Sequence, residues 1–303
     1  FSCLYGTTLN TGRVMSPTLA MAVEREATIS AFQPESFYQV QLDFDGFSVS
    51  GERMKTREEA ENLEATCRRE GSASIGKIVQ VEKMEKPPAL YDLTTLQREA
   101  NRVLGYTAQQ TLDYVQALYE KKLVTYPRTD SRYLTEDMAG MLSELAAVTV
   151  AICFPEAGSV SVNAEQVVNS KRVTDHHAII PTKEVQNGTL SELPKGELEI
   201  LRLIAKRLLS AVSAPCRYAE TTAEIFCGGT AFKAKGKTVL SAGWKEIEEK
   251  CGSKKKKDKA NILPHLQENT TLPLLSAEVK EGKTTPPKHF TEDTLLQIME
   301  TAG

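Results

Sequence analysis

The sequence predicts a multidomain protein with both α and β structure, in which a β-rich domain is interrupted by an inserted, mainly helical domain. Three observations predict this fold class. Apolar and polar residues alternate with period two in residues 33–88 and again in residues 214–285. Between them, residues 89–213 have the apolar spacing of amphipathic helices. Proline-containing breaks at residues 86–88 and at Pro215 mark the two points of insertion.

The two ends of the chain are predicted to be helical and to belong to a further domain. A helix is expected over residues 13–32, with Ser16 as its N-cap and Pro17 at its first helical position. Residues 286–303 begin with a proline pair and continue into a second helix that stops at Gly303. Because an amphipathic helix rarely ends a domain so abruptly, we expect this chain to be a piece of a longer protein.

The β-rich domain is expected to open with a hairpin, since Asp45-Gly46 is a favoured two-residue turn between alternating segments. Thr56, with Glu59 three residues later, forms a capping-box pattern that begins a helix ending near Arg69. The predicted strands are 37–44, 47–50, 72–83, 219–226, 231–234, 238–240 and 271–279.

The inserted domain contains four predicted helices. The first ends at Gly105, and the second is capped by Thr107 and directs Tyr119 toward its apolar face. A third helix follows Thr135, and residues 196–212 form the fourth, strongly amphipathic helix.

Composition predicts an ordinary water-soluble protein in the cytoplasm. The 303 residues are 41% hydrophobic and 25% charged, and no run approaches the roughly 18 apolar residues of a membrane span. The six cysteines form no CxxC pair, so we expect reduced thiols and no metal site. A net charge of −3 gives no support to nucleic-acid binding by the whole chain, although a local groove can still be positive. The basic run Lys254–Lys257 is predicted to be a solvated loop, with phosphate contact as the second interpretation.

The segment with the strongest chemical character is Leu-Val-Thr-Tyr-Pro-Arg-Thr-Asp-Ser, residues 123–131. A short buried strand is expected to break at Pro127, which leaves Tyr126 and Arg128 at a strand end facing a cleft. A phenol is a nucleophile, and a guanidinium matches the oxygens of a phosphate. The alternative is a half-buried tyrosine before an ordinary turn, and these residues alone favour that alternative.

A second polar cluster, Thr-Asp-His-His-Ala-Ile-Ile-Pro-Thr, occupies residues 174–182. An imidazole can shuttle a proton near neutral pH, so His176 is a candidate for that role, and Asp175 is a candidate to orient it. The alternative is a pair of exposed imidazoles at the start of a strand. The interpretation that His176 and His177 bind one metal ion together has less support, because adjacent side chains on a strand point to opposite faces.

These segments together resemble type IA DNA topoisomerases over essentially the whole chain. Residues 125–131 match the active-site tyrosine motif of that family, and residues 175–182 match its histidine motif. Residues 11–17, Thr-Gly-Arg-Val-Met-Ser-Pro, resemble its Gly-Arg-Val-Gln-Ser/Thr-Pro segment. Residues 286–295, Pro-Pro-Lys-His-Phe-Thr-Glu-Asp-Thr-Leu, and residues 91–97, Tyr-Asp-Leu-Thr-Thr-Leu-Gln, resemble two further segments.

The resemblance implies an arch-shaped, ATP-independent enzyme that acts on single-stranded DNA as a monomer. Tyr126 would attack a DNA phosphate and form a 5′-phosphotyrosine, a second strand would pass through the gap, and the break would be resealed. Arg128 would bind the scissile phosphate and stabilise charge in the transition state, and His176 would support proton transfer or contact the DNA backbone. The remaining DNA-binding residues would be Arg13, Thr129, Ser131 and Lys288, and the end segments 1–32 and 286–303 would belong to a DNA-binding domain.

The sequence departs from the family in a few positions. Met15 replaces the usual glutamine, and Thr285 and His289 replace common basic residues. The acidic Mg²⁺-binding domain of the family, called TOPRIM, would precede Phe1, and no Asp-x-Asp-x-Glu cluster is present in this sequence. We therefore expect Mg²⁺ to be bound by a domain absent from this chain, and the chain alone to be inactive.

Two other functions remain as alternatives. A tyrosine recombinase also uses a tyrosine nucleophile, but it needs two arginines and an intervening histidine, and it forms the opposite, 3′-phosphotyrosine adduct. The second alternative is a non-catalytic module that binds single-stranded DNA or a partner, in which Tyr126 is structural; full burial of Tyr126 would favour it.

Overall fold

The computed structural model describes residues 4, 6–8, 12–187, 190–252 and 263–301. The helices are α2 (Met15–Ser30), α3 (Arg57–Glu70), α4 (Leu93–Leu104), α5 (Ala108–Glu120), α6 (Leu142–Cys153), α7 (Lys195–Val212), α8 (Trp244–Cys251) and α9 (Glu292–Thr301). The strands are β1 (Ser36–Phe44), β2 (Phe47–Ser50), β3 (Ser72–Glu85), β4 (Cys216–Cys227), β5 (Thr230–Ser241), β6 (Thr271–Pro273) and β7 (Ser276–Lys283). Cys3 and Lys254–Lys257 lie outside the described residues.

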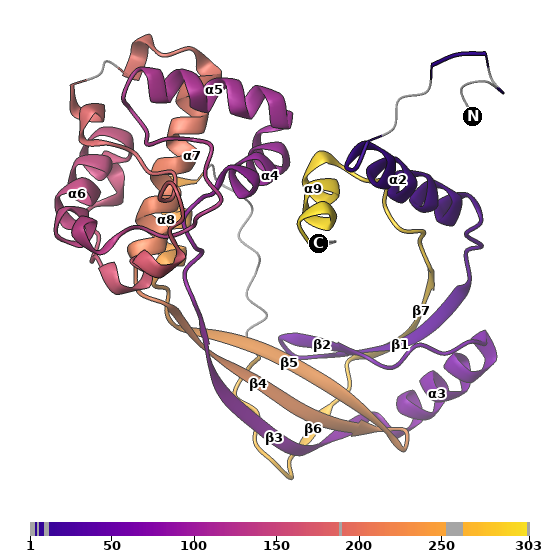
Figure 1. The fold of residues 1–303 in the computed structure, drawn as a ribbon. Coiled ribbons are helices and arrows are strands. Elements are labelled where there is room, and N and C mark those ends of the chain that lie inside the picture. The colour runs from indigo at the N-terminus through magenta and orange to yellow at the C-terminus, as the bar shows by residue number, and fades with distance from the viewer. Residues whose placement is uncertain (1–3, 5, 9–11, 188–189, 253–262, 302–303) are drawn as a thin grey trace.

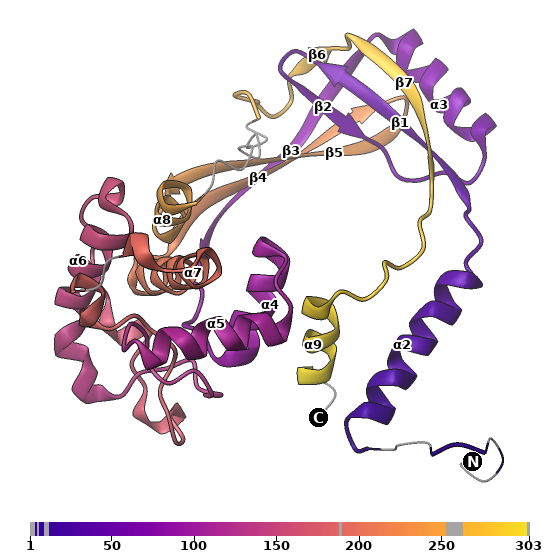
Figure 2. The same cartoon turned by 90° about the horizontal axis from the view of Figure 1, so that it is seen from above.

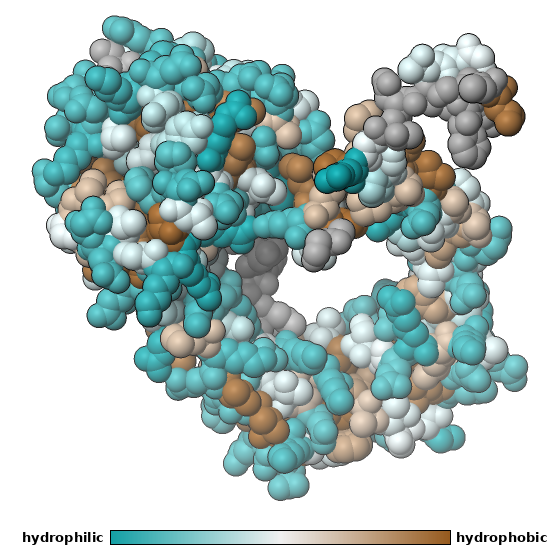
Figure 3. All heavy atoms as spheres, viewed as in Figure 1, coloured by the Kyte–Doolittle hydropathy of each residue, from teal (hydrophilic) through white to brown (hydrophobic). Residues whose placement is uncertain are grey.

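The elements form a ring (Figure 1). The helices α4 to α8 lie together on one side, the strands form the base, α2 lies opposite the helical group, and α9 lies between α2 and α4. Figure 2, seen from above, shows the long strands β3, β4 and β5 running from the helical group to the smaller sheet. The space-filling view in Figure 3 shows an opening through the molecule.

Two antiparallel sheets make up the β structure, in the orders β2-β1-β7 and β5-β4-β3-β6. The predicted hairpin is confirmed, with Phe44 opposite Phe47 across the Asp45-Gly46 turn. Val40 of β1 pairs with Val279 of β7, which joins segments from the two ends of the chain. Strands predicted at 231–234 and 238–240 are one strand, β5. The single strand predicted over 271–279 is two strands, β6 and β7, separated by Leu274 and Leu275.

The β structure and the helical group have separate apolar cores. Side chains of both sheets pack with α3 around Val40, Leu42 and Phe232, all 1% exposed or less. Three further clusters lie among residues 90–212, and α8 contributes Ile247 to one of them. Helix α8, which the sequence did not predict, therefore packs on α7 although it follows β5 in the chain.

Several helix ends follow from the predicted caps. The hydroxyl of Thr56 accepts a hydrogen bond from the Glu59 amide, and Thr107 forms a full capping box with Gln110. Gly105 ends α4 in the left-handed conformation, at φ 75°.

Two predicted caps are wrong. Val14, not Ser16, is the N-cap of α2, so Pro17 lies at the third helical position. Thr135 precedes a 3-10 turn and makes no capping hydrogen bond with its side chain.

The long sheet is exposed on both faces over its middle. Val79 and Val81 on one face of β3 are 41% and 47% exposed, and Met84 on the other face is 61% exposed. In this stretch β3 pairs with β4, and these side chains stay exposed on both faces of the strand within the described structure. We call this exposed part of the β3–β4 pair the ribbon. It is held together mainly by the backbone hydrogen bonds between the two strands.

Charged side chains close the ring where α9 meets α4. Arg98 of α4 contacts Asp293 at 2.9 Å and Glu300 at 3.2 Å. Arg132, which also binds Asp92, contacts Glu300 at 2.6 Å. We call this group of contacts the α4–α9 latch. The side chains of the ion pairs that reach α9 keep 17–36% of their surface exposed, so each pair contributes little free energy and weakens with salt.

Replacing Glu300 by Gln is expected to open the latch more often, because two ion pairs lose their shared carboxylate. We expect about 0.5–1 kcal/mol, or a several-fold larger open population, at low salt. Förster transfer between dyes on the exposed residues Lys55 and Asp113 measures the opening. Glu58→Gln on α3 is the matched control. An unchanged distance distribution for Glu300→Gln, with a salt response equal to that of wild type, would contradict the latch.

Candidate active site

The tyrosine segment and the histidine segment lie side by side because their backbones pair. The Thr125 amide donates to the Ile180 carbonyl at 3.0 Å, and the Thr182 amide donates to the Leu123 carbonyl at 3.0 Å. Val124 forms an isolated bridge with Pro181, not the regular strand that was predicted. Buried Leu123 and Val124 anchor this pairing in the helical core. It brings together two segments about fifty residues apart.

Tyr126 is half-buried and lies between two rings. Its ring centroid is 4.3 Å from that of His176, with an interplanar angle of 42°. On another side, the Tyr119 ring makes an edge-to-face contact with it at 5.4 Å. Tyr126 also lines an open cavity of about 520 Å³, which agrees with the predicted position facing a cleft. Its hydroxyl makes no hydrogen bond to any described residue.

Arg128 is exposed beside Tyr126 and makes no ion pair or hydrogen bond within the described part of the chain. A fixed positive charge without a protein partner is available to a phosphate. His176 is exposed too, and no hydrogen bond from Asp175 orients it in the described structure. The imidazole Nδ1 of His177 instead lies 2.9 Å from its neighbour's carbonyl, that of Ala178.

Thr129 and Ser131 are buried, at 8% and 4% exposed. The Thr129 hydroxyl donates to the His176 carbonyl at 2.7 Å, and the Ser131 hydroxyl donates to the Arg172 carbonyl at 2.9 Å. The first bond holds the loop after Tyr126 against the histidine segment, and the second holds it against the residues just before that segment. Both hydroxyls thus donate to backbone carbonyls in this structure, and their predicted contact with DNA stays a prediction.

Arg13 precedes α2 in the chain, Lys288 precedes α9, and both are exposed. Arg25 of α2 donates to the Lys288 carbonyl and stacks on the Phe290 ring at 4.3 Å. These contacts tie the two end segments to each other, but neither Arg13 nor Lys288 is hydrogen-bonded or ion-paired to the Tyr126 loop in the described structure. The latch connects the two sides instead.

Sequence reasoning missed two residues near Tyr126, Lys122 and Arg132, and it placed a third, Tyr119, on the apolar face of its helix. Tyr119, predicted on the apolar face of its helix, is 39% exposed. Lys122 has a left-handed backbone, at φ 61°, and lines the same cavity. Arg132 binds buried Asp92 at 2.5 Å. The one available signal was position: all three flank the tyrosine motif within seven residues.

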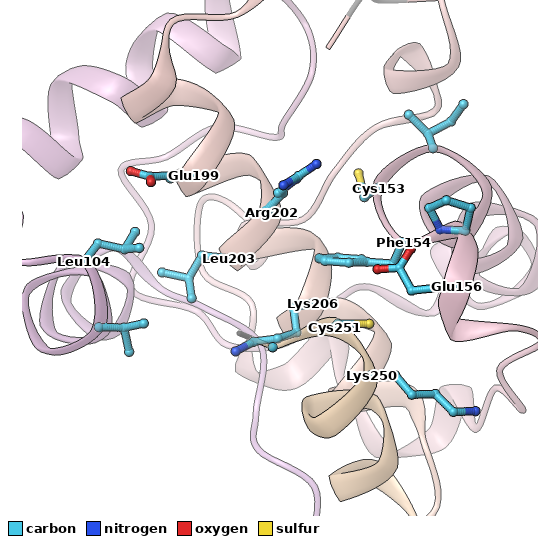
Figure 4. A pocket seen from close by; sticks show the side chains of 14 residues that line it. Leu104, Cys153, Phe154, Glu156, Glu199, Arg202, Leu203, Lys206, Lys250 and Cys251 are labelled. Atoms are coloured by element: carbon cyan, nitrogen blue, oxygen red, sulfur yellow. The ribbon is translucent and has the colours of Figure 1, made fainter. Parts of the chain in front are cut away.

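A larger cavity of about 630 Å³ lies elsewhere in the helical group (Figure 4). Arg202, Lys206 and Lys250 surround it together with Glu156 and Glu199. Two thiols, Cys153 and Cys251, lie on its wall, and burial raises the pKa of each to about 11. They are therefore neutral thiols near pH 7. This cavity shares no lining residue with the cavity at Tyr126.

The five described cysteines, Cys67, Cys153, Cys216, Cys227 and Cys251, form no disulfide with one another. No group of three or more His, Cys, Asp or Glu side chains in the described ranges is placed to bind a metal ion. No helix within those ranges is long and apolar enough to cross a membrane.

The ring encloses an opening, and the loop that carries Tyr126 and Arg128 lies beside the segment that carries His176. A family model described as DNA topoisomerase matches residues 2–303, and the chain therefore belongs to this family. It is 39% identical to DNA topoisomerase 3 of Bacillus subtilis and 40% identical to that of Bacillus licheniformis, in each case over 96% of this chain. The chain spans 42% of the length of each of these relatives.

The fold is similar to that of full-length topoisomerase I from Thermotoga maritima. The TM-score is 0.76 at 24% identity, and the match covers 98% of this chain and 49% of that structure. The predicted resemblance to type IA topoisomerases is thus confirmed, together with the mixed α and β fold class.

Proposed function

We propose that this chain is the central part of a type IA DNA topoisomerase and that Tyr126 is its nucleophile. The observation that carries the proposal is the contact of Tyr126 with His176 beside unpaired Arg128, at an open cavity. The proposal includes action on single-stranded DNA, as a monomer, in the cytoplasm. Half-burial of Tyr126 supports a catalytic role over a purely structural one, because a core tyrosine would be enclosed.

In the proposed reaction, the Tyr126 hydroxyl oxygen attacks the phosphorus of a phosphodiester. The new bond joins the phenolic oxygen to phosphorus, the bond to the 3′ oxygen breaks, and that oxygen leaves as a 3′-hydroxyl. His176 assists transfer of the phenolic proton, and Arg128 stabilises negative charge on the phosphate oxygens. The covalent bond conserves the energy of the phosphodiester, so attack by the 3′-hydroxyl reseals the strand without ATP.

Mg²⁺ is the cofactor implied for the family. The described residues offer no cluster of ligands that fits it, so no step above is routed through a metal. We propose that a separate domain of a longer parent chain supplies the metal site. The chain of 303 residues alone is then expected to form no adduct with a single-stranded oligonucleotide in Mg²⁺.

The test is the polarity of the adduct. Oligonucleotides labelled at either end are incubated with the longer parent chain and Mg²⁺, then denatured. We expect the protein to retain the label on the 3′ side of the break and to release a fragment ending in a 3′-hydroxyl. Retention of the label on the 5′ side would indicate the 3′-phosphotyrosine of a recombinase. Binding without any adduct would favour the non-catalytic single-strand-binding module.

A further inference from the structure

The cavity beside Tyr126 has walls suited to a flat aromatic ligand. Tyr119, Tyr126 and His177 contribute rings, and Val124 contributes a buried apolar side chain. Its volume of about 520 Å³ lies within the range of small-molecule pockets. Tyr119 is held by its edge-to-face contact with Tyr126, yet it keeps 39% of its surface exposed.

Lys122 stands at the rim of this cavity in a conformation that lysine rarely adopts. It follows the last turn of α5 at φ 61°, where glycine is the favoured residue. Its amide donates to the Tyr119 carbonyl at 2.8 Å, and its carbonyl accepts a hydrogen bond from the Thr182 hydroxyl. A strained, non-glycine residue beside a candidate site indicates that its side chain is needed there.

The charges around the cavity leave the Lys122 ammonium available. Within the described structure it makes no hydrogen bond or ion pair, whereas its neighbour Lys121 is bound to Glu197 at 2.5 Å. The one carboxylate of the lining, Glu120, accepts a hydrogen bond from Gln116 at 3.1 Å. The site thus combines exposed aromatic surface with one free cation.

We propose that this cavity binds one nucleobase of the DNA strand that Tyr126 attacks, stacked on Tyr119, while Lys122 contacts an adjoining phosphate. The inference rests on the proposed function, which it deepens by adding a base-binding site next to the nucleophile. Stacking on tyrosine tolerates every base, since each base has a π-face. The site therefore holds the strand in place without selecting a sequence.

The first test compares a thymidine oligonucleotide with an abasic one of equal length and charge. Wild-type protein is expected to prefer the thymidine oligonucleotide. Tyr119→Leu is expected to lose about 5-fold to 150-fold in affinity for it and little for the abasic strand. Tyr119→Phe, which keeps the ring, is expected to retain the preference. An equal loss for both oligonucleotides in Tyr119→Leu would overturn base stacking.

The second test uses Lys122→Gly, which is expected to raise thermal stability and to weaken DNA binding. Removing the strain is expected to raise the thermal midpoint by about 1–3 °C. Loss of the cation is expected to weaken binding and to reduce the salt slope of log K by about 0.7. If the midpoint rises while affinity and slope stay unchanged, Lys122 does not contact phosphate and the inference is overturned.

The adduct assay separates this inference from the proposed function. An adduct in the longer parent chain, with no base preference at Tyr119, leaves the nucleophile assignment intact and removes only the base-binding site. A base preference without any adduct supports the site and removes the catalytic assignment.

Discussion

Replacing Tyr126 by Phe is expected to abolish the covalent adduct of the longer parent chain with DNA, because the attacking oxygen is removed. Folding should be unaffected, since the Tyr126 hydroxyl makes no hydrogen bond within the described structure and the ring contacts with His176 and Tyr119 remain. Single-strand affinity is also expected to change by less than about 3-fold, because the stacking surface is kept. Denaturing gels and equilibrium binding measure the two quantities.

The matched control is Tyr38→Phe in β1. Its backbone pairs with Met54, far along the ring from the Tyr126 loop, and its hydroxyl has no hydrogen-bond partner in the described structure. It should form adduct at the wild-type rate. Adduct formation by Tyr126→Phe at a rate near that of Tyr38→Phe would show that another residue is the nucleophile.

Arg207→Met is expected to cause the largest loss of stability, about 3 kcal/mol of unfolding free energy. Arg207 of α7 binds Glu99 of α4, and their side chains are only 13% and 9% exposed. It also donates to the Tyr91 hydroxyl at 3.2 Å and lies over that ring at 4.3 Å. Without Arg207, the Glu99 carboxylate is buried with only exposed Arg102 at 3.7 Å as a partner.

Chemical denaturation measures this effect, with Arg202→Met as the control on the same helix. Arg202 is exposed and makes no ion pair in the described residues, so its replacement should change stability by less than about 0.5 kcal/mol. The double variant Glu99→Leu with Arg207→Met should recover much of the loss, because no buried charge is left unpaired. Equal stabilities of Arg207→Met and Arg202→Met would show that the buried pair of Arg207 and Glu99 does not stabilise the protein.

Local signals in the sequence predicted most of the elements but not how they meet. The Asp45-Gly46 turn, the Thr107 cap and the Gly105 end depend on neighbouring residues, and each appears where it was predicted. Helix α8 has few apolar residues of its own, and its place depends on packing against α7. The contact of α4 with α9 joins residues about 200 positions apart, which no local pattern reports.

The candidate site was predictable only through the family resemblance. Spacing alone gave no reason to join Tyr126 to His176, because their proximity depends on the pairing of Thr125 with Ile180. The sequence also could not predict which of the nearby side chains are exposed. Thr129 and Ser131 are polar residues close to Tyr126, yet their hydroxyls donate to the backbone carbonyls of His176 and Arg172. Tyr119 was assigned to the core for its spacing, although it ends its helix at the surface.

The two sides of the ring are joined by the long strands at its base and by the α4–α9 latch, and these two connections differ in mechanical strength. On the ribbon side, β3 and β4 run antiparallel, so separating them along their length requires many hydrogen bonds to break together. On the other side, Arg98 and Arg132 hold two carboxylates. A pulling force across the ring should therefore rupture the salt-sensitive contacts first and leave the ribbon as an elastic hinge. In a force spectroscopy experiment, the molecule would extend and reclose without unfolding.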